Sequence, residues 1–347
     1  MVTSRLPGEG QSLDMAPLVR QIRSLESIGA QVELLEIKGA RRVKYLTSIP
    51  ALRRRARSVD VIHAHYGYCG WLARTSLSKP IVCSFMGDDL LGSPDENGDV
   101  GQLSKLIVRS SRLLARMIDA VIVKSVEMAA VVAPTSAYVI PNGVDMDMFA
   151  PLDTREARAA LGWSDDRRYI LFPGNPDNPR KGFRLAESAV EHASRLVSDR
   201  MELIRLRDVP PDRVPLYMNA CDVMLMTSYI EGSPNVVKEA MSCNRPVVSV
   251  PVGDVGELFE PADGNALCPR DPQALGVAVA EVLERADRSQ GRAVLQQKGL
   301  DLESVAKRIV RVYEDVVQAC ITDRPAAKQA CGAGQQSEYQ PIGNAND

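Results

Sequence analysis

The chain has 347 residues, a length that predicts two domains at about 100 to 200 residues each. Hydrophobic residues make up 45% of the chain and charged residues 25%, which excludes collagen-like, coiled-coil and wholly disordered proteins. Lys and Arg number 42 against 44 Asp and Glu, and the resulting net charge of -2 gives no chain-wide basic field to hold nucleic acid.

The apolar runs and the cysteines indicate the cellular compartment of the protein. No run reaches the length of about 18 apolar residues that a membrane span needs, and the start, Met1 to Arg5, lacks the apolar core of a signal peptide. Seven cysteines without a Cys-x-x-Cys pair favour reduced thiols over a disulfide frame or a zinc site. We therefore expect a cytoplasmic protein.

In the first half, β-type runs alternate with helical patterns, which predicts a parallel sheet with crossover helices and hence the α/β class. Pro7-Gly8-Glu9-Gly10 follows only six residues, so strand one is very short or the numbered chain begins inside it. A helix is expected between Asp14 and Gly29, with a stripe of Leu18, Val19, Ile22 and Leu25. The expected strands are residues 32–37, 60–66, 80–85, 120–124 and 137–140.

The second half repeats this rhythm, with expected strands at residues 169–172, 202–206, 222–227 and 246–250. Between the halves, residues 141–149 contain Pro and Asn-Gly, which favour a turn. We therefore predict an N-terminal domain over 1–143 and a C-terminal domain over 144–302. A helix over 303–320, with one apolar face, is expected to cross back to the first domain, and the aperiodic residues 321–347 are expected to be disordered.

The segment 228–241 carries the richest chemistry. Ser233 is expected to cap a helix that begins at Pro234, so that the amides from Asn235 onward and the positive end of the helix dipole form an anion site. Glu231 then precedes the helix and Glu239 lies inside it, at two depths around that site. This pattern suits a nucleoside diphosphate sugar, and a capped helix with two solvated glutamates is the alternative.

A second loop follows the expected strand at 169–172. It contains Gly174, Asn175 and the cations Arg180 and Lys181 at the C-terminal end of a parallel strand. A cation there could neutralise a diphosphate leaving group, whereas a solvated surface pair is the simpler alternative.

With both loops considered, the chain resembles the large family of retaining GT-B glycosyltransferases that use nucleotide sugars. The resemblance covers about residues 2–318 and is most specific at Glu231 and Glu239, which are separated by seven residues that include Gly-Ser-Pro-Asn. It implies two Rossmann-like domains that face each other across a cleft, with the donor in the C-terminal domain. It also implies hexosyl transfer to an acceptor hydroxyl with retention, in the synthesis of cell-surface polysaccharide, glycolipid or glycoconjugate. The other segments that carry the resemblance are residues 60–65, 86–88, 140–149, 181–182 and 245–248.

The same resemblance implies roles for individual residues. Glu231 would lie near the reacting carbon, Glu239 would bind the ribose hydroxyls, and Lys181 would hold the diphosphate. Further donor contacts are implied for Gly8, Gly174, Asn175, Arg180, Gly232, Ser233, Pro234, Asn235 and Val236, and contacts with the sugar or acceptor for Met86, Gly87 and Asp88.

Two positions depart from the family pattern. Met86 stands where a His is common, and Asn175 stands where an Arg is common, which leaves Lys181 with Arg180 to neutralise the leaving group. Two alternatives therefore stay open. One is a sugar-nucleotide-binding partner that has lost turnover, and the other is a sugar-nucleotide epimerase using residues such as His65, Asp88 and Asp89.

No metal or cofactor is expected beyond the donor substrate. The Asp145-Met146-Asp147 triplet lies at the expected domain junction without further ligands nearby, and His63 and His65 alternate on a strand without an acid cluster beside them.

Two stretches of the N-terminal half are basic and free of acids. The first runs from Lys38 to Arg57, and the second, residues 102–118, carries Lys105, Arg109, Arg112 and Arg116 among apolar residues. Such surfaces are typical of attachment to anionic lipid or to an anionic acceptor. A solvated face over a core helix is the alternative.

Overall fold

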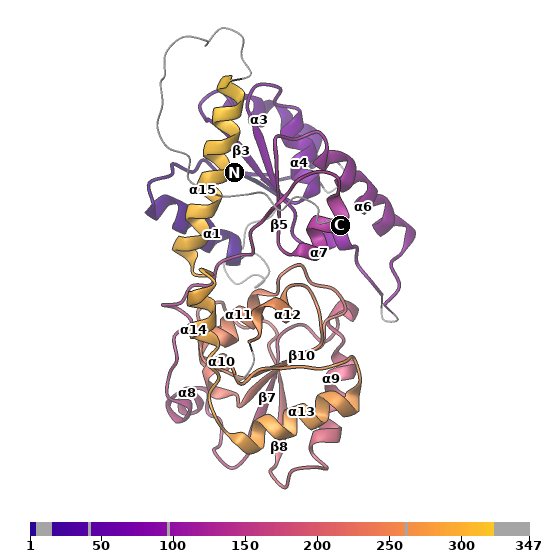
Figure 1. Ribbon diagram of the computed structural model, residues 1–347, viewed down its shortest axis with the longest axis vertical. Helices are drawn as coiled ribbons and strands as arrows, with labels where there is room; N and C mark the ends of the chain where they lie inside the picture. The colour runs from indigo at the N-terminus through magenta and orange to yellow at the C-terminus, as the bar shows by residue number, and fades with distance from the viewer. Residues whose placement is uncertain (5–15, 41–42, 96–97, 261–262, 323–347) are drawn as a thin grey trace, which may run out of the picture.

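The computed structural model describes residues 1–4, 16–40, 43–95, 98–260 and 263–322, and contains two parallel sheets (Figure 1). The six-stranded sheet has the order β2-β1-β3-β4-β5-β6, and the five-stranded sheet has the order β11-β10-β9-β7-β8. The α/β class is thus confirmed. The first sheet contains β1 (Val2–Thr3), β2 (Leu35–Glu36), β3 (Ile62–His65), β4 (Ile81–Ser84), β5 (Ala120–Val123) and β6 (Tyr138–Val139). The second contains β7 (Arg168–Phe172), β8 (Met201–Arg205), β9 (Val223–Met226), β10 (Val247–Ser249) and β11 (Ala266–Leu267).

Every strand expected from the sequence is present, usually shortened at its ends, while β11 was missed. This edge strand is two residues long and pairs only with β10, so its sequence offers no apolar run to detect.

Both faces of the first sheet are buried because successive side chains of a strand point to opposite sides. Ile81 and Cys83 of β4 join one core, whereas Val82 joins the other. The helices that follow β1 to β5 are α1 (Ala16–Ser27), α2 (Lys44–Thr47), α3 (Ile49–Arg55), α4 (Gly67–Arg74), α5 (Asp88–Leu91), α6 (Gln102–Ala115) and α7 (Val126–Val132).

The last described helix, α15 (Leu302–Thr322), returns to the first sheet, where it packs beside α1 (Figure 1). Its buried residues share a core with Leu25 of α1 and Ile122 of β5. They are Val305, Ala306, Ile309, Val312 and Val316. The helix includes Ile321 and Thr322, which were expected in a disordered tail, and residues 323–347 lie outside the described residues.

Helix α1 buries a different stripe from the expected one. Leu18 and Leu25 are buried, but Val19 and Ile22 are only half-buried, while Arg20 and Gln21 are buried instead. The helix is covered on more than one side, because α15 packs against it and Arg20 reaches the second sheet's unit. The C-terminal end of the helix agrees with the prediction, since Gly29 just after it has a φ of +93°. The predicted cap, Asp14, lies outside the described residues.

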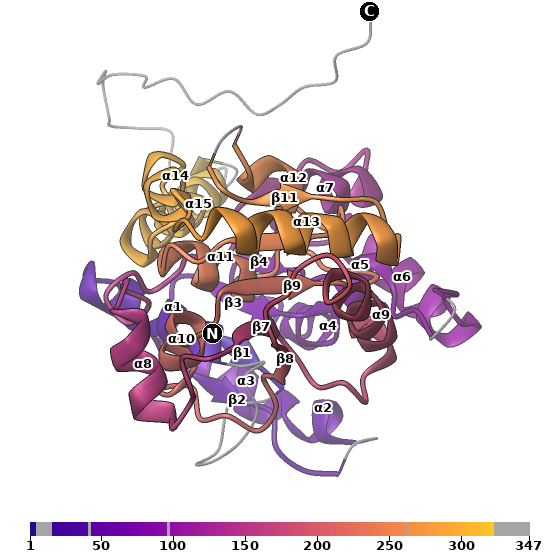
Figure 2. The same cartoon turned by 90° about the horizontal axis from the view of Figure 1, so that it is seen from below.

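The second sheet carries α8 (Thr154–Leu161), α9 (Phe183–Ala193), α10 (Val214–Ala220), α11 (Asn235–Ser242), α12 (Val255–Leu258), α13 (Pro272–Arg285) and α14 (Gly291–Gln297). Helices α9 and α13 pack against each other, and α13 lies across the lower part of the molecule in Figure 1, which Figure 2 views from below. Within the described part of the chain, no helix is long and apolar enough to cross a bilayer.

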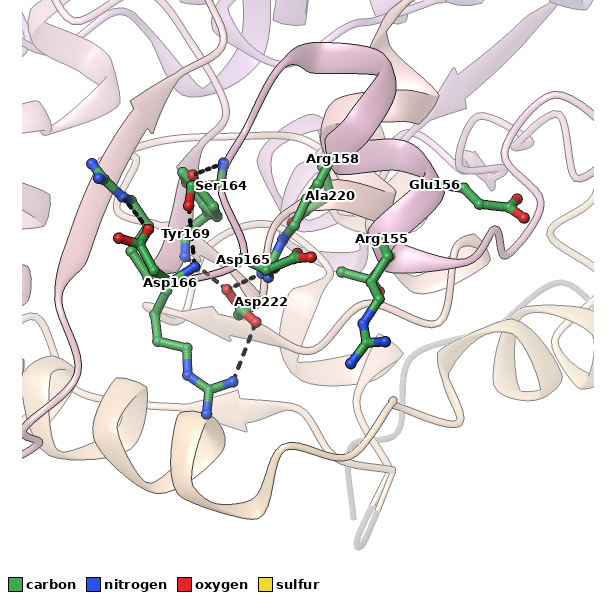
Figure 3. A network of polar contacts seen from close by, with 12 residues as sticks. Arg155, Glu156, Arg158, Ser164, Asp165, Asp166, Tyr169, Ala220 and Asp222 are labelled. Atoms are coloured by element: carbon green, nitrogen blue, oxygen red, sulfur yellow. Dashed lines mark hydrogen bonds and ion pairs between the residues drawn. The ribbon is translucent and has the colours of Figure 1, made fainter.

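A buried ionic network ties α8 to the amino-terminal ends of β7 and β9 (Figure 3). Arg158 donates from Nε to the Ala220 carbonyl at 2.9 Å and from Nη2 to Asp222 Oδ2 at 2.7 Å. The same Asp222 oxygen accepts the Tyr169 amide at 2.7 Å. The network thus fixes the amino-terminal ends of these strands, whereas the functional side chains are expected at the carboxyl ends.

Replacing Arg158 with Ala is expected to lower the free energy of unfolding by about 3 to 5 kcal/mol, because Asp222 would lose its closest buried cation. Urea denaturation followed by circular dichroism measures this loss. Arg155→Ala is the matched control, since Arg155 lies exposed on the same helix. Equal stability of the two variants would contradict a structural role for the Arg158 network.

Candidate active site

The carboxyl ends of the two sheets meet at two loops. Gly232, after β9, lies against the loop after β4, so that a Cβ on Gly232 would be 3.1 Å from the Met86 carbonyl oxygen and 2.8 Å from Met128 Sδ. Gly87 has a φ of +138°, a backbone conformation that L-residues rarely adopt. Glycine at both positions lets the two units approach closely, and the loop that carries Glu231 lies at their junction.

Glu231 and Lys181 form an ion pair in this junction. Lys181 Nζ lies 2.7 Å from Glu231 Oε1, and both side chains are largely buried. Burial alone would raise the pKa of Glu231, but the Lys181 and Arg180 cations outweigh it and hold the pKa below its ordinary value. The site therefore keeps an ionised carboxylate beside an ammonium group.

The backbone around Lys181 is held from both sides. Gly182 has a φ of +65°, and a Cβ there would lie 2.4 Å from the Thr227 carbonyl oxygen. Thr227 Oγ1 donates to the Lys181 carbonyl at 3.0 Å. A Cβ on Gly174 would lie 3.3 Å from Lys181 Cγ, so Gly174 leaves room for the lysine stem.

Glu239 lies on α11, and its carboxylate is paired with Arg20 of α1. Arg20 Nη2 lies 2.5 Å from Glu239 Oε1, and both side chains are buried. This contact joins the two units, and sequence reasoning missed it because the partners are 219 positions apart and Arg20 lies off the expected apolar stripe. Arg20 thus occupies one acceptor position of the Glu239 carboxylate.

The expected cap at Ser233 is wrong. Helix α11 begins at Asn235 with Pro234 as its N-cap, because the Ser233 hydroxyl donates to Asp254 Oδ2 at 2.6 Å instead of capping. Ser233 Oγ also accepts from Lys238 Nζ at 2.9 Å. The amides of Asn235 and Val236 still open the first turn of the helix, where no intrahelical acceptor exists.

Lys238 anchors this loop from beneath. It is fully buried, and its Nζ donates to the Asn142 carbonyl at 2.7 Å in the segment between the two sheets. Burial lowers the pKa of the Lys238 ammonium to about 8. Sequence reasoning missed this role of Lys238. Its position among the apolar residues of 236–241 was the one signal in the sequence for a buried polar network.

Several buried polar atoms near α11 lack a partner among the described residues. They include Arg20 Nε on one unit and Asn235 Oδ1 and Asp254 Oδ1 on the other. Buried polar groups are normally hydrogen-bonded, so this concentration is typical of a site that a polar ligand completes.

The loop after β4 is organised by Asp89, which is fully buried. Its carboxylate accepts the amides of Met86 at 2.9 Å, Gly87 at 3.1 Å and Gly67 at 3.1 Å. Burial raises the pKa of Asp89 to about 7, although these amides oppose the shift. Asp88 is half-buried and accepts from the Tyr66 hydroxyl at 3.3 Å.

Of the remaining residues predicted to contact the donor, Arg180 lies near the site and Asn175 forms a local turn. Arg180 is half-buried near Glu231, whereas Asn175 is exposed and its Oδ1 accepts the Asp177 amide at 3.0 Å in a local turn. Gly8 lies outside the described residues.

His63 and Asp145 each form hydrogen bonds within the protein. His63 Nδ1 lies 2.6 Å from the Tyr313 hydroxyl, and its Nε2 lies 2.8 Å from Ser84 Oγ. Asp145 Oδ1 accepts the Met148 amide at 2.9 Å. Across the described ranges, no group of three or more His, Cys, Asp or Glu side chains could hold a metal ion.

Two family models match the chain. Residues 184–285 match the model described as Glycosyl transferases group 1, and residues 20–148 match the model described as Glycosyltransferase Family 4. Both models describe glycosyltransferases, so the chain resembles this class of enzyme in each of its two halves. The two matched segments carry the two loops that meet at Gly87 and Gly232.

Relatives in sequence include a D-inositol 3-phosphate glycosyltransferase of Geodermatophilus obscurus, 25% identical over 73% of this chain and 66% of the relative. The putative teichuronic acid biosynthesis glycosyltransferase TuaC of Bacillus subtilis is 26% identical over 67% of this chain and 63% of the relative. The chain thus spans just under two thirds of the length of these relatives.

Solved structures share the GT-B fold of the family. Sucrose-phosphate synthase from Thermosynechococcus elongatus superposes with a TM-score of 0.69 at 19% identity, covering 87% of this chain and 93% of that one. The Anabaena protein Alr3699/HepE, solved in complex with UDP, superposes with a TM-score of 0.66 at 19% identity, covering 90% and 98%.

Proposed function

We propose that this protein is a retaining glycosyltransferase that moves a sugar, of the hexose class, from a nucleoside diphosphate to an acceptor hydroxyl. The observation that carries the proposal is the Lys181–Glu231 ion pair, which lies at the junction of the two sheets with Glu239 on the adjoining helix. The relatives' names support a product in cell-surface polysaccharide, glycolipid or glycoconjugate synthesis.

The donor would lie along the start of α11. Lys181, with Arg180 nearby, supplies positive charge for the diphosphate, and the amides of Asn235 and Val236 supply further donors at the helix start. Glu239 would accept the ribose hydroxyls in place of Arg20. The remaining donor contacts would come from Gly174, Gly232, Ser233 and Pro234.

Charge stabilisation is the main catalytic task in this arrangement. As the bond between sugar and phosphate breaks, negative charge grows on the diphosphate and positive charge on the sugar. Lys181 would neutralise the first charge and ionised Glu231 the second. The departing phosphate can take the acceptor proton on the same face of the sugar, which accounts for retention without a covalent intermediate.

The loop at Met86 and Gly87 would face the sugar and the acceptor, with half-buried Asp88 at its end. Met86 supplies a backbone carbonyl at the junction but no ring. This loop therefore contributes shape and backbone polarity, and the electrostatic contribution comes from the other side of the junction.

The epimerase alternative is disfavoured by burial. Of its three candidate acid or base groups, Asp89 is 0% and His65 4% exposed, and Asp89 is occupied with three amides. A partner protein that binds a nucleotide sugar without turnover stays open, because it would keep the same charges.

A panel of nucleotide sugars, incubated with the protein and followed by mass spectrometry, tests the proposal. UDP-sugars come first, because UDP is bound in the Anabaena structure. Release of the nucleoside diphosphate supports a transferase, whereas conversion to an isomeric nucleotide sugar supports the epimerase. Binding by calorimetry without consumption of any donor would indicate the non-catalytic partner.

Glu239→Ala is expected to weaken nucleoside diphosphate binding by about 10- to 150-fold, the equivalent of roughly 1.5 to 3 kcal/mol for a lost charged hydrogen bond. Calorimetry measures the change. The control is Arg20→Gln, which breaks the same ion pair but keeps the carboxylate, so its affinity should equal or exceed that of the wild type. Equal weakening by both variants would mean that the ion pair between the units matters and that Glu239 does not contact the ribose.

A further inference from the structure

The second acid-free stretch forms an exposed amphipathic helix. In α6, Leu103 is 73%, Leu106 60% and Leu113 53% exposed, and Met117 just after the helix is 41% exposed. Positions three, four or seven residues apart lie on one side of a helix, so these four side chains form one apolar ridge. Leucines this exposed and aligned in one ridge differ from singly scattered surface residues.

A basic stripe lies beside the ridge. Lys105, Arg109, Arg112 and Arg116 are all exposed, and within the described residues no carboxylate forms an ion pair with any of them. Residues 102–118 contain no acid. At 1.5 Å per residue, the 14-residue helix presents both stripes over about 21 Å.

The third side of α6 is locked onto the protein. Ser111, Leu114 and Ala115 are buried, and a Cβ on Gly70 of α4 would lie 2.5 Å from Leu114 Cδ2. Trp71 Nε1 donates to Ser110 Oγ at 2.8 Å. The ridge and the stripe are therefore held in place on the outer edge of the first unit, away from α15, as Figures 1 and 2 both show.

The first basic stretch, in contrast, uses many of its cations internally. Arg53 Nε donates to the Thr75 carbonyl at 2.9 Å, Arg55 donates to the Leu34 carbonyl, and Lys38 pairs with Glu36 at 3.0 Å. Arg41 and Arg42 lie outside the described residues. The first stretch also exposes Val43 and Leu46, but they lie at or just before the four-residue helix α2 and form no ridge. Of the two basic stretches, α6 is thus the one in which exposed apolar side chains and unpaired cations line a single long helix.

We propose that α6 is a membrane-docking helix that lies in the interface of an anionic bilayer. Leu103, Leu106, Leu113 and Met117 would enter the boundary between headgroups and acyl chains, while the four cations contact anionic headgroups. An apolar ridge flanked by charge of one sign fits this surface, whereas a nucleic acid or an acidic protein tail would leave the leucines in water. The docking does not depend on the proposed transfer activity.

This docking would also orient the site. Gly98, in the segment before α6, lies against the ring of Tyr229, since a Cβ on Gly98 would be 3.5 Å from Tyr229 Cδ1. Tyr229 precedes Glu231 by two residues. A bilayer under α6 would therefore lie beside the junction of the two units, where a lipid-linked acceptor could reach it.

Co-sedimentation with vesicles tests the proposal. The vesicles contain either phosphatidylcholine alone or phosphatidylcholine with phosphatidylglycerol, at low and high salt. The wild-type protein should sediment with the anionic vesicles at low salt, and less so at high salt. Absence of binding to anionic vesicles at low salt would overturn the proposal.

Paired variants separate the ridge from the stripe. Arg109→Gln with Arg112→Gln should lower partitioning about 25-fold, at about fivefold for each cation. Leu103→Gln with Leu106→Gln should lower it about 100-fold, at about tenfold for each leucine. Leu196→Gln, at a residue 49% exposed on the second unit, should change nothing. If the leucine pair binds as the wild type does, the contact is not an inserted helix.

Variants in the first basic stretch, residues 38–57, test the alternative location of the membrane contact. If Arg53→Gln with Arg54→Gln lowers partitioning more than the α6 arginine pair does, the membrane contact lies at residues 38–57 and the assignment to α6 is wrong. A fluorescent reporter tests insertion directly, because Leu106→Trp should shift its emission to the blue and be quenched by brominated lipid, whereas Leu196→Trp should do neither. Lack of quenching in Leu106→Trp would contradict insertion.

Discussion

Glu231→Gln is expected to lower kcat by about 10² to 10³ while donor affinity stays within about threefold, because a carboxylate beside the reacting carbon acts mainly on charge that develops in the transition state. The amide keeps the shape of the side chain and removes its charge. Steady-state kinetics and calorimetry on the same variant separate the two quantities.

The matched control for this variant is Glu260→Gln. Glu260 forms an ion pair with Lys298 at 2.5 Å on the surface of the same unit, so this substitution breaks a similar pair outside the site. Wild-type turnover in Glu231→Gln would mean that the reacting carbon lies elsewhere. A loss of donor affinity with kcat unchanged would assign Glu231 to binding alone.

Lys181→Ala is expected to lower kcat/KM by about 10² to 10³, with losses in both donor affinity and kcat, because a diphosphate carries charge before and after the bond breaks. Lys298→Ala is the matched control, since it removes a lysine from the surface pair with Glu260. An unchanged kcat/KM in Lys181→Ala would remove this cation from the mechanism.

The same variant has a characteristic pH dependence. In the wild type, Lys181 and Arg180 hold the pKa of Glu231 below its ordinary value, so the carboxylate stays ionised as the pH falls to that lower pKa. Without Lys181, burial is opposed less and the pKa of Glu231 rises. The acid limb of the profile of kcat/KM against pH should therefore move to higher pH. A limb that stays in place would assign it to another group.

The order of elements was accessible from the sequence because buried parallel strands are continuous apolar runs, as in residues 80–85 and 120–124. Lys181 and Glu231 were accessible for a related reason. Each follows a recognisable strand, and the carboxyl ends of parallel strands gather at one sheet edge. Their mutual pairing at 2.7 Å required only that β7 and β9 be neighbours.

The contacts that the sequence could not supply are those between distant elements. Arg20 reaches Glu239 across the two units, and Lys238 reaches the Asn142 carbonyl in the connecting segment. The position of Arg20 or Lys238 in its helix does not indicate which distant residue it contacts. Ser233 was misassigned for the same reason. Its hydroxyl could cap α11 locally, but it donates to the carboxylate of Asp254 instead, because a hydrogen bond to a charged group is stronger.

The exposed ridge of α6 is an intermediate case. The sequence predicted a basic surface with apolar residues at residues 102–118, but it could not tell which apolar positions face the core. The structure assigns Leu114 to the core and leaves Leu103, Leu106 and Leu113 outside.

The central claim, retaining sugar transfer at the Lys181–Glu231 junction, is tested most directly by ¹H NMR of the sugar during reaction of an α-linked nucleotide sugar with wild-type protein and with Glu231→Gln. The account predicts that the first anomer formed by the wild type is α, before it equilibrates in solution, and that Glu231→Gln forms it far more slowly. A first-formed β anomer, or equal rates for the two proteins, would contradict it.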